Sequence, residues 1–442
     1  MNSSRALNAP WLTSGPTSRV LQLLNDNGEE ARVVGGAVRN ALLDIPCGDI
    51  DIATTAVPAE VIRRAKAAGI KSVPTGIDHG TVTLVVDAQP FEVTTLREDT
   101  ETFGRKAKVA FGRDWVGDAH RRDFTINALS AGADGIVHDY VGGLDDIASR
   151  RVRFIGRAEQ RIAEDYLRIL RFFRMHAAFG TGEVDRAGYL ACIAGRAGLA
   201  TLSAERLRME MLKLLVADGA LGAVTAMADG GLLLPIFGGI AYTGPFATMI
   251  MAERLLELKP DPIRRLAALA VAVTEDAKRV AGRLRLSNAE TKALDSMGHR
   301  WWRLAGADEA RARRLLYRLG EDNYRNRLML AWARVGGDAD EKTTDAKTTD
   351  AKTTDAKSTD AKTTDTKTWL DLATLPQRWN APKFPLKAAH FIARGVAEGP
   401  ALGHVLTLGE DAWLAADFPL DEAALNSIAD QAVSRLTRDP RS

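Results

Sequence analysis

The spacing of apolar and polar positions follows two different periodicities along the chain. Between residue 30 and about residue 100, short apolar runs and period-two alternation mix with helical spacing, which predicts strands and helices in turn. The predicted strands are Ala31–Val34, Asp49–Ile52, Thr81–Val86 and Phe91–Leu96, the last two forming a hairpin across Asp87–Pro90. The predicted helices are Val38–Leu43, opened by two glycines, and Pro58–Ala68, with proline at its start.

From about Asp118 onward the pattern turns helical, and strand signals almost disappear. Glu164–Phe179 carries apolar residues at intervals of three and four, and Ala204–Val216 repeats that spacing. The predicted fold class is therefore α+β: a small mixed-sheet head, followed by an elongated all-helical neck, body and tail.

One tract, from Asp338 to Thr368, repeats the pentad KTTDA and has almost no apolar bulk. Such a composition cannot offset the entropy of ordering, so it predicts a disordered linker. The predicted domains are an N-terminal extension (1–30), a head (31–150), a helical neck (151–230), a helical body (231–337), the linker (338–368) and a C-terminal helical tail (369–442) that contacts RNA.

The formal charge of +2 gives the whole molecule no strong attraction for a polyanion, so any nucleic-acid contact has to come from local basic clusters.

Cys47 and Cys192 lack metal-ligand spacing and are interpreted as thiols in a reducing compartment. The low-charge stretch Gly230–Ala252 is interrupted by prolines and glycines, so no membrane span is expected. With no signal-peptide pattern at the start, we expect a cytoplasmic protein.

The chemistry is concentrated in a Gly-Gly turn followed by two aspartates. Gly35 and Gly36 allow the backbone to approach a phosphate, the helix they open points N–H groups at it, and Arg39 adds charge. In a strand, Asp49 and Asp51 face the same way, and two such carboxylates suit Mg²⁺. A phosphate cradle beside a magnesium-holding pair is what nucleotidyl transfer needs. The competing interpretation is a loop before an edge strand with solvated aspartates.

The order Gly-Gly-x-Val-Arg, then Asp-x-Asp, resembles the polymerase-β-type nucleotidyltransferase superfamily. In detail the chain resembles the class II tRNA nucleotidyltransferase (CCA-adding) and bacterial poly(A) polymerase family from about residue 31 to residue 216. The resemblance implies a Mg²⁺-dependent enzyme that adds CCA, from CTP and ATP, to the 3′ end of tRNA and releases pyrophosphate. The implied partners are the 3′ end and acceptor arm of tRNA and the two nucleotides, with no DNA and no membrane.

The segment Arg121–Leu129, with the sequence RRDFTINAL, looks on its own like a capped surface helix. In the family this motif binds the ribose and triphosphate of the incoming nucleotide. The resemblance therefore assigns that role to Arg122, Asp123 and Asn127, with Asp118 in the usual acidic position before them.

The segment from Glu164 to Arg174 contains the family's EDxxR motif. Its spacing alone predicts an amphipathic helix on which Asp165 and Arg168 share one face, with surface ion pairs worth about 0.3–0.5 kcal/mol each. The resemblance instead implies that Asp165 and Arg168 select the base without a template, because a carboxylate accepts and a guanidinium donates to its Watson–Crick edge. Arg171 and Arg174 are predicted to line the same pocket.

Four further positions carry weaker predictions. The polar segment Arg97–Arg105 is predicted to be weakly structured and occupies the place of the family's flexible loop, which favours full CCA addition. Glu92 is either a third metal-binding carboxylate or a solvated residue. Asn40 stands where the family usually has Asp, so altered bonding at the phosphate turn is expected. Asp139–Asp146 is either a hinge between head and neck or a plain turn before a helix.

Several alternatives share these motifs. A poly(A) polymerase, or an enzyme adding only CC or only A, belongs to the same family. An inactive RNA-binding scaffold and a small-molecule nucleotidyltransferase belong to other classes. The predicted RNA contacts are basic residues on helices: Arg206, Arg208, Arg264, Arg265, Arg279, Arg283, Arg285, Arg311, Arg313, Arg314 and Arg318.

Overall fold

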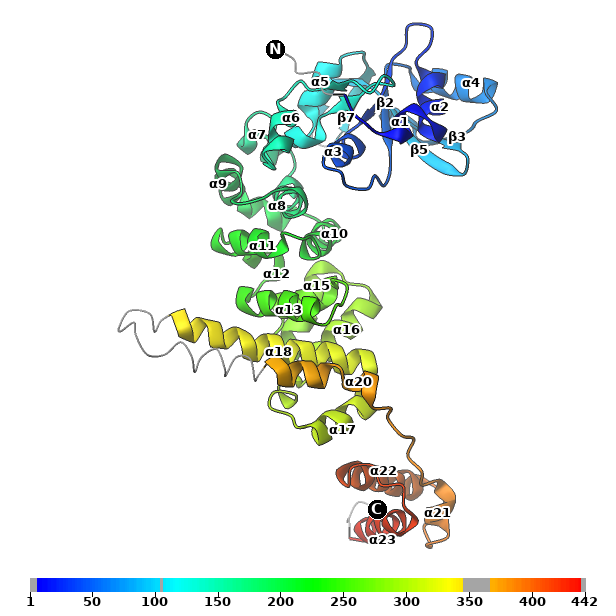
Figure 1. The fold of residues 1–442 in the computed structure, drawn as a ribbon, viewed down its shortest axis with the longest axis vertical. Coiled ribbons are helices and arrows are strands. Elements are labelled where there is room, and N and C mark those ends of the chain that lie inside the picture. The colour runs from blue at the N-terminus through cyan, green and yellow to red at the C-terminus, as the bar shows by residue number, and fades with distance from the viewer. Residues whose placement is uncertain (1–5, 104–105, 345–365, 439–442) are drawn as a thin grey trace. The chain divides into compact units, whose positions relative to one another are not determined.

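A computed structural model describes residues 6–103, 106–344 and 366–438. The chain divides into two compact units, Met1–Ile236 and Phe237–Ser442 (Figure 1). Within the described ranges, no helix combines the length and the apolar character needed to cross a membrane. The predicted head and neck both fall in the first unit.

The first unit is built on a mixed sheet, as predicted. Its described residues form seven strands in the order β3-β4-β5-β2-β1-β8-β9, with β2 parallel to β5 and the other neighbours antiparallel. The strands are β1 (Ala31–Val34), β2 (Asp51–Thr54), β3 (Lys71–Gly76), β4 (Thr81–Val86), β5 (Gln89–Thr95), β8 (Ser130–Ala131) and β9 (Val137–His138). The prediction for β2 is wrong at its start, because the strand begins at Asp51 and leaves Asp49 in the preceding loop.

The predicted hairpin is confirmed in β4 and β5. Val82, Leu84 and Val86 are buried while the residues between them are not, as period-two alternation requires. Asp87 (φ 50°) and Ala88 (φ 64°) form the connecting turn. Two consecutive residues with positive φ are typical of the tight turn whose twist matches the flanking strands.

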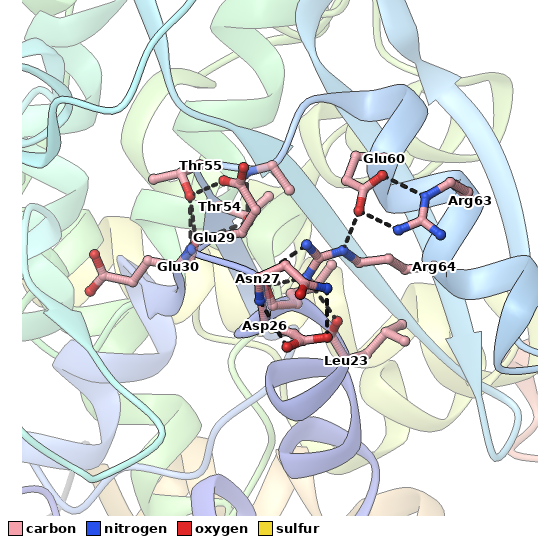
Figure 2. Close-up of polar contacts among 12 residues, drawn as sticks. Leu23, Asp26, Asn27, Glu29, Glu30, Thr54, Thr55, Glu60, Arg63 and Arg64 are labelled. Carbon is pink, nitrogen blue, oxygen red and sulfur yellow. Dashed lines mark hydrogen bonds and ion pairs between the residues drawn. The ribbon is translucent and has the colours of Figure 1, made fainter.

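The N-terminal residues form two helices, α1 (Pro10–Thr13) and α2 (Gly15–Leu24), that belong to the head. Helix α2 packs against β1, β4 and α4 (Pro58–Ala67). Buried Arg64 of α4 donates hydrogen bonds to carbonyls at and after the end of α2, and Glu60 binds the same guanidinium at 2.7 Å (Figure 2). An arginine that satisfies otherwise orphaned helix carbonyls fixes α2 to α4.

A second, two-stranded sheet pairs β6 (Arg97–Phe103) with β7 (Lys106–Phe111). The prediction that Arg97–Arg105 is weakly structured is wrong for residues 97–103, and residues 104 and 105 lie outside the described range. Backbone pairing, which does not require apolar side chains, holds this polar strand in place.

The remaining helices of the first unit are α3 (Gly36–Leu42), α5 (Trp115–Arg121), α6 (Gly143–Ala148), α7 (Ala158–Glu164), α8 (Leu167–Phe179), α9 (Arg186–Ala194), α10 (Ala204–Leu215) and α11 (Ala220–Asp229), with α12 (Leu233–Phe237) at the unit boundary. Along the chain, α3 lies between β1 and β2, α5 lies between β7 and β8, and the others follow β9. Helix α8 packs against α10 and α11. The predicted continuous helix Glu164–Phe179 is interrupted, because Asp165 is extended (φ −156°) between α7 and α8.

The described residues of the second unit form helices joined by loops and contain no strand. Its helices are α13 (Thr243–Leu255), α14 (Pro262–Ala270), α15 (Thr274–Leu284), α16 (Asn288–Gly298), α17 (Glu309–Leu319), α18 (Glu321–Thr344), α20 (Leu375–Arg378), α21 (Ala388–Ile392), α22 (Pro400–Ala415) and α23 (Glu422–Leu436). Helix α18 packs along α13 and ends inside the predicted linker, whose residues 345–365 lie outside the described range. Fully buried Trp413 lies in the core formed by α21, α22 and α23.

Candidate active site

The glycine turn after β1 positions the first helix of the site. Gly35 has φ 69° and precedes α3, where its N–H donates to the carbonyl of Leu129 at 3.0 Å. A Cβ at this position would also meet Arg122 Nη1 at 3.1 Å. Positive φ and this close approach together require glycine, which leaves the N-terminus of α3 open to an anion.

Arg39 of α3 is held by neutral partners. Its Nη1 donates to Asn127 Oδ1 at 2.5 Å, and Nε and Nη2 donate to Asn40 Oδ1 at 3.1 and 2.8 Å. Its guanidinium lies 3.7 Å from the ring centroid of Phe179. Burial, reinforced by the charge of Arg174, lowers the pKa of Arg39 to about 10. Since no anionic partner neutralises it among the described residues, its charge is available to a ligand.

Asn40 also joins this arginine to the loop before β2. Its Nδ2 donates to the carbonyl of Pro46 at 3.3 Å, which a carboxylate at this position would not do. The amide of Asn40 therefore makes hydrogen bonds near the glycine turn, Gly35-Gly36, that the family's usual Asp would not make.

Carboxylates gather where β2 and β5 run in parallel. Asp51 pairs in register with Glu92, and both side chains are exposed. Although Asp51 borders solvent, the surrounding protein partly desolvates its carboxylate and raises its pKa, and the charges of Glu92 and Asp49 raise it further, while Arg122 acts in the opposite direction. Such mutual repulsion between oxygen ligands is what a divalent cation would relieve, so the donor chemistry fits a hard metal ion. No cluster of three or more potential metal ligands is assembled within the part of the chain that the structure describes.

A cavity of about 520 Å³ opens beside Asp51. All ten residues predicted to bind nucleotide line it, as does Asp51, whereas Asp49 does not. The predicted residues are Gly35, Gly36, Arg39, Arg122, Asp123, Asn127, Asp165, Arg168, Arg171 and Arg174. Among the described lining residues, six arginines against three aspartates leave a formal charge of +3, which suits a triphosphate.

The residues after α5 connect the head to α8. Arg122 binds Asp118 at 3.1 Å, and Asn127 Nδ2 donates to Asp123 Oδ1 at 3.3 Å. Asp123 Oδ2 in turn binds Arg171 of α8, at 2.6 Å from Nη2. The polar residues of the RRDFTIN segment thus form one hydrogen-bonded network with Arg171 of α8. They do not lie on an isolated surface helix.

Asp165, at the break between α7 and α8, and Arg168 of α8 both line the same cavity. Asp165 Oδ1 accepts from Leu167 N at 3.1 Å, and Asp165 Oδ2 binds Arg206 of α10 at 2.6 Å. Burial acts to raise the pKa of Asp165, but these hydrogen bonds and the nearby arginine charges outweigh it and lower the pKa. Arg168 binds Glu164 at 2.5 Å. The expectation that Asp165 and Arg168 share one helical face is wrong, although both line the cavity.

Three lining or supporting residues were missed as site residues by the sequence analysis. Arg206 was noted only as an RNA contact, yet it holds Asp165. Phe179 stacks under Arg39, and Glu210, only 3% exposed, binds Arg174 at 2.5 Å. An acidic residue on a predicted amphipathic helix gives no signal of burial, so Glu210 could not have been found from the sequence.

Asp139 caps α6. Its Oδ1 accepts from the N–H groups of Val141, Gly142 and Gly143, and its Oδ2 accepts from Leu144 N. Asp139–Asp146 is therefore a turn before a helix, as one of the two interpretations has it. Hinge motion of this segment stays a prediction.

Some predicted RNA contacts are structural instead. Arg264 and Arg265 are 8% and 5% exposed, and both bind Glu253, at 2.9 and 2.6 Å. Their assignment to RNA is wrong, because buried, paired guanidinium groups have no free donors for phosphate.

Comparisons with known proteins identify the class of the head. Residues 31–153 match the family described as "Poly A polymerase head domain", and residues 191–243 match "Probable RNA and SrmB- binding site of polymerase A". The predicted resemblance to the tRNA nucleotidyltransferase and poly(A) polymerase family is thereby confirmed for these regions.

Individual proteins similar to this chain carry more specific names than these two family descriptions. The chain is 39% identical over 276 residues to "CCA tRNA nucleotidyltransferase 1, mitochondrial" of Mus musculus, covering 61% of this chain and 62% of the relative. It is 40% identical over 223 residues to the CCA-adding enzyme of Leuconostoc citreum, covering 50% and 54%. The chain thus spans about three-fifths or less of the length of these curated relatives.

Solved structures extend the similarity of fold over almost the whole chain. The Bacillus stearothermophilus CCA-adding enzyme in complex with CTP matches with a TM-score of 0.68 at 24% identity, covering 98% of this chain and 100% of that one. The Thermotoga maritima CCA-adding enzyme complexed with tRNA_CCA matches with a TM-score of 0.68 at 19% identity, covering 99% and 100%. The predicted fold class is therefore confirmed.

Proposed function

We propose that this protein is a template-independent nucleotidyltransferase that adds CCA, from CTP and ATP, to the 3′ end of tRNA. The observation that carries the proposal is the single cavity in which the phosphate turn, Asp51, the RRDFTIN residues and the Asp165–Arg168 pair all meet. Relatives named as CCA tRNA nucleotidyltransferases at about 40% identity support the same substrate. We also propose that it works in the cytoplasm.

The triphosphate of the incoming nucleotide lies against the N-terminus of α3 in this proposal. Arg39 and Arg122 donate to its oxygens, and Asn127 holds Arg39 in orientation through the 2.5 Å hydrogen bond. Asp123, which accepts from both Asn127 and Arg171, fixes the spacing between the head and Arg171 of α8. Guanidinium forks are suited to phosphate because they present paired donors without losing their charge.

Asp165 and Arg168 read the base. Arg206 and the Leu167 amide keep Asp165 ionised, so it offers acceptors to the exocyclic amino groups of cytosine or adenine. Arg168, oriented by Glu164, offers donors to the ring nitrogen or carbonyl beside that amino group. Guanine and uracil present the opposite pattern at these positions, so their Watson–Crick edges would not pair with Asp165 and Arg168.

Asp51, together with Asp49 and Glu92 beside it, is the carboxylate group that would hold Mg²⁺. When bound, Mg²⁺ would lower the pKa of the attacking hydroxyl and offset the negative charge of the triphosphate. The 3′-hydroxyl oxygen of the RNA forms a bond to the α-phosphorus, the bond to the bridging oxygen breaks, and pyrophosphate leaves. The protein's own contribution is to align these atoms and to stabilise charge with arginines set in place beforehand.

A 3′-extension assay tests the proposal. Transcripts of tRNA ending at the discriminator base, at C or at CC are incubated with the full chain, Mg²⁺ and each nucleotide singly or together, and the products are sequenced. We expect completion to CCA followed by arrest, and a loss of at least about a thousandfold in Asp51→Ala. No extension of any transcript by the wild-type protein would overturn the proposal.

The same assay distinguishes CCA addition from the second candidate function, that of a poly(A) polymerase. The name of the matched head domain favours this second candidate. Long adenosine tracts on arbitrary RNA would establish that function instead. Arrest after CC, or addition of A only to transcripts ending in CC, would identify a partial CCA-adding enzyme. Tight tRNA binding without any addition would identify an RNA-binding scaffold.

A further inference from the structure

Arg161 of α7 lies between two groups of residues that the proposed function assigns to different parts of the nucleotide. It does not line the cavity beside Asp51, and its side chain is only 12% exposed. Its Nη1 donates to Glu164 Oε2 at 2.6 Å. Its Nη2 donates to the backbone carbonyls of Arg121 and Arg122, at 2.6 Å for Arg122. One guanidinium group thus joins α7 to the end of α5.

Arg168 of α8 is attached to the same side chain. Its Nη1 donates to Glu164 Oε2 at 2.5 Å and to the backbone carbonyl of Arg161 at 2.6 Å. Glu164 Oε2 therefore accepts from both arginines, and Arg161 contacts Arg168 through its own carbonyl as well. Because the two arginines share these partners, a shift of one displaces a partner of the other.

The carbonyls that Arg161 binds are those at which α5 ends. Arg122 follows the helix in an extended conformation, with ψ 164°. The last carbonyls of a helix have no partner within it, so a side chain that binds them fixes the helix end. From this point the side chain of Arg122 reaches the cavity, where Asp118 binds it at 3.1 Å and the carbonyl of Asn127 accepts from its Nη1 at 3.3 Å. Arg161 thus fixes the backbone of Arg122, while Asp118 and Asn127 orient its guanidinium group.

Packing alone does not explain an arginine at position 161. The Nε of Arg161 is buried and has no hydrogen-bond partner among the described residues. Burial and the charge of Arg168 also lower the pKa of Arg161, with Glu164 and Asp123 acting in the opposite direction. An apolar side chain of similar volume would carry neither cost. The arginine is explained by the groups that its two terminal nitrogens bind together.

The separation of Arg168 and Arg122 matters because one ligand has to reach both. In the proposed function, Arg168 contacts the base and Arg122 contacts the triphosphate. A nucleotide gains the full affinity of both contacts only if the two groups are already held at a matching separation, since ordering them on binding would cost free energy. The hydrogen bonds of Arg161 supply that restraint from a single side chain.

We propose that Arg161 is a positioning residue that couples base selection to triphosphate binding, by holding Arg168 and the backbone of Arg122 at a fixed separation. The proposal rests on the proposed function, from which the roles of Arg168 and Arg122 are taken. A nucleotide whose base pairs with Arg168 uses both contacts at once. A nucleotide whose base does not pair with Arg168 keeps only the triphosphate contacts.

Nucleotide binding without RNA, measured by calorimetry on the full chain with Mg²⁺, tests the coupling. The ligands are CTP, UTP and inorganic triphosphate. We expect Arg161→Gln to weaken CTP binding about tenfold and UTP binding by less than about twofold, because only CTP uses Arg168 and Arg122 together. Inorganic triphosphate should bind as it does to the wild type, because Asp118 still orients Arg122. Arg157→Gln, on an exposed arginine immediately before α7, is the matched control and should bind all three ligands like the wild type.

A double variant separates positioning from a general effect on the fold. In an Arg168→Ala background, Arg161→Gln should change the CTP affinity by less than about twofold, because residues that act through one another are not additive. A purely structural role would instead weaken all three ligands in both backgrounds and lower the thermal midpoint. If Arg161→Gln does not fold, Arg161→Lys decides the question. Lysine keeps the charge but loses the fork that binds Glu164 and the two carbonyls together, so CTP binding should weaken about threefold with UTP binding unchanged.

Unchanged CTP affinity in the folded variant, or equal weakening of all three ligands, would overturn the coupling. Because RNA is absent from the measurement, the two proposals fail separately. A wild-type protein that completes CCA on tRNA, while Arg161→Gln keeps the full preference for CTP over UTP, would refute only the coupling. A wild-type protein that never extends tRNA, while Arg161→Gln loses that preference, would refute only the proposed function.

Discussion

The arginines of the cavity beside Asp51 and those around Glu253 differ in what surrounds them more than in how they are paired. In the cavity, Arg174 binds Glu210 and Arg171 binds Asp123, each through a carboxylate that is at most 10% exposed, while the arginines themselves are 21% and 37% exposed. In the second unit, the side chain of Glu253 is 1% exposed, and the side chains of its two arginines are 9% and 6% exposed.

The difference shows what makes a basic residue available to a ligand. A buried carboxylate behind an exposed guanidinium orients it and leaves its outer donors free. A carboxylate enclosed between two buried guanidinium groups uses the donors of both. Among arginines paired with a carboxylate, pairing alone therefore does not distinguish a binding arginine from a structural one, whereas the remaining exposure of the guanidinium does.

The largest effect on stability should follow from breaking the enclosed cluster. Glu253→Gln leaves Arg264 and Arg265 buried without their shared counter-charge, so we expect a loss of about 3 kcal/mol in the free energy of unfolding, measured with urea. The matched control is Glu321→Gln, which breaks the exposed pair with Arg325 and should cost less than about 0.5 kcal/mol. Equal effects of the two variants would contradict the distinction.

The same distinction can be tested within one helix, α4, where two neighbouring arginines share Glu60 (Figure 2). Arg64 is 6% exposed and satisfies carbonyls at the end of α2, whereas Arg63 is 63% exposed. We expect Arg64→Ala to lower the free energy of unfolding by about 2 kcal/mol, since charged hydrogen bonds to buried carbonyls are lost. Arg63→Ala should leave the unfolding curve unchanged, and a reversed order would show that exposure is a poor guide.

A smaller effect, on catalysis, should follow from Arg39→Lys. Lysine keeps the charge but cannot bond Asn40 and Asn127 together, so the cation is no longer fixed toward the triphosphate. We expect kcat/KM for CTP to fall about tenfold, with an unchanged thermal midpoint. Arg63→Lys, on an exposed arginine of the same unit, serves as the control. A wild-type kcat/KM in Arg39→Lys would mean that charge alone suffices there.

Much of the head was predictable because its signals are local. Period-two alternation predicts β4 and β5, and the glycine turn predicts the start of α3, since both depend on neighbouring residues only. The resemblance then identified ten residues from separate segments, and the structure brings all ten to one cavity.

The errors arise where tertiary contacts decide the outcome. The break at Asp165 depends on the contact of its carboxylate with Arg206 of another helix, which the helical spacing of the segment does not reveal. Pairing with β7 orders the polar strand β6. Burial of Arg264, Arg265 and Glu210 likewise depends on packing between helices, which an amphipathic pattern does not specify.

The most direct test of the account is nucleotide binding in the absence of RNA. The dissociation constants of CTP, ATP, GTP and UTP are measured by calorimetry for the wild type and for Arg168→Ala, with Mg²⁺ present. If Asp165 and Arg168 select the base without a template, CTP and ATP should bind at least about tenfold more tightly than GTP and UTP, and Arg168→Ala should remove most of that preference. Equal binding of all four nucleotides by the wild type, or an unchanged preference in Arg168→Ala, would contradict it.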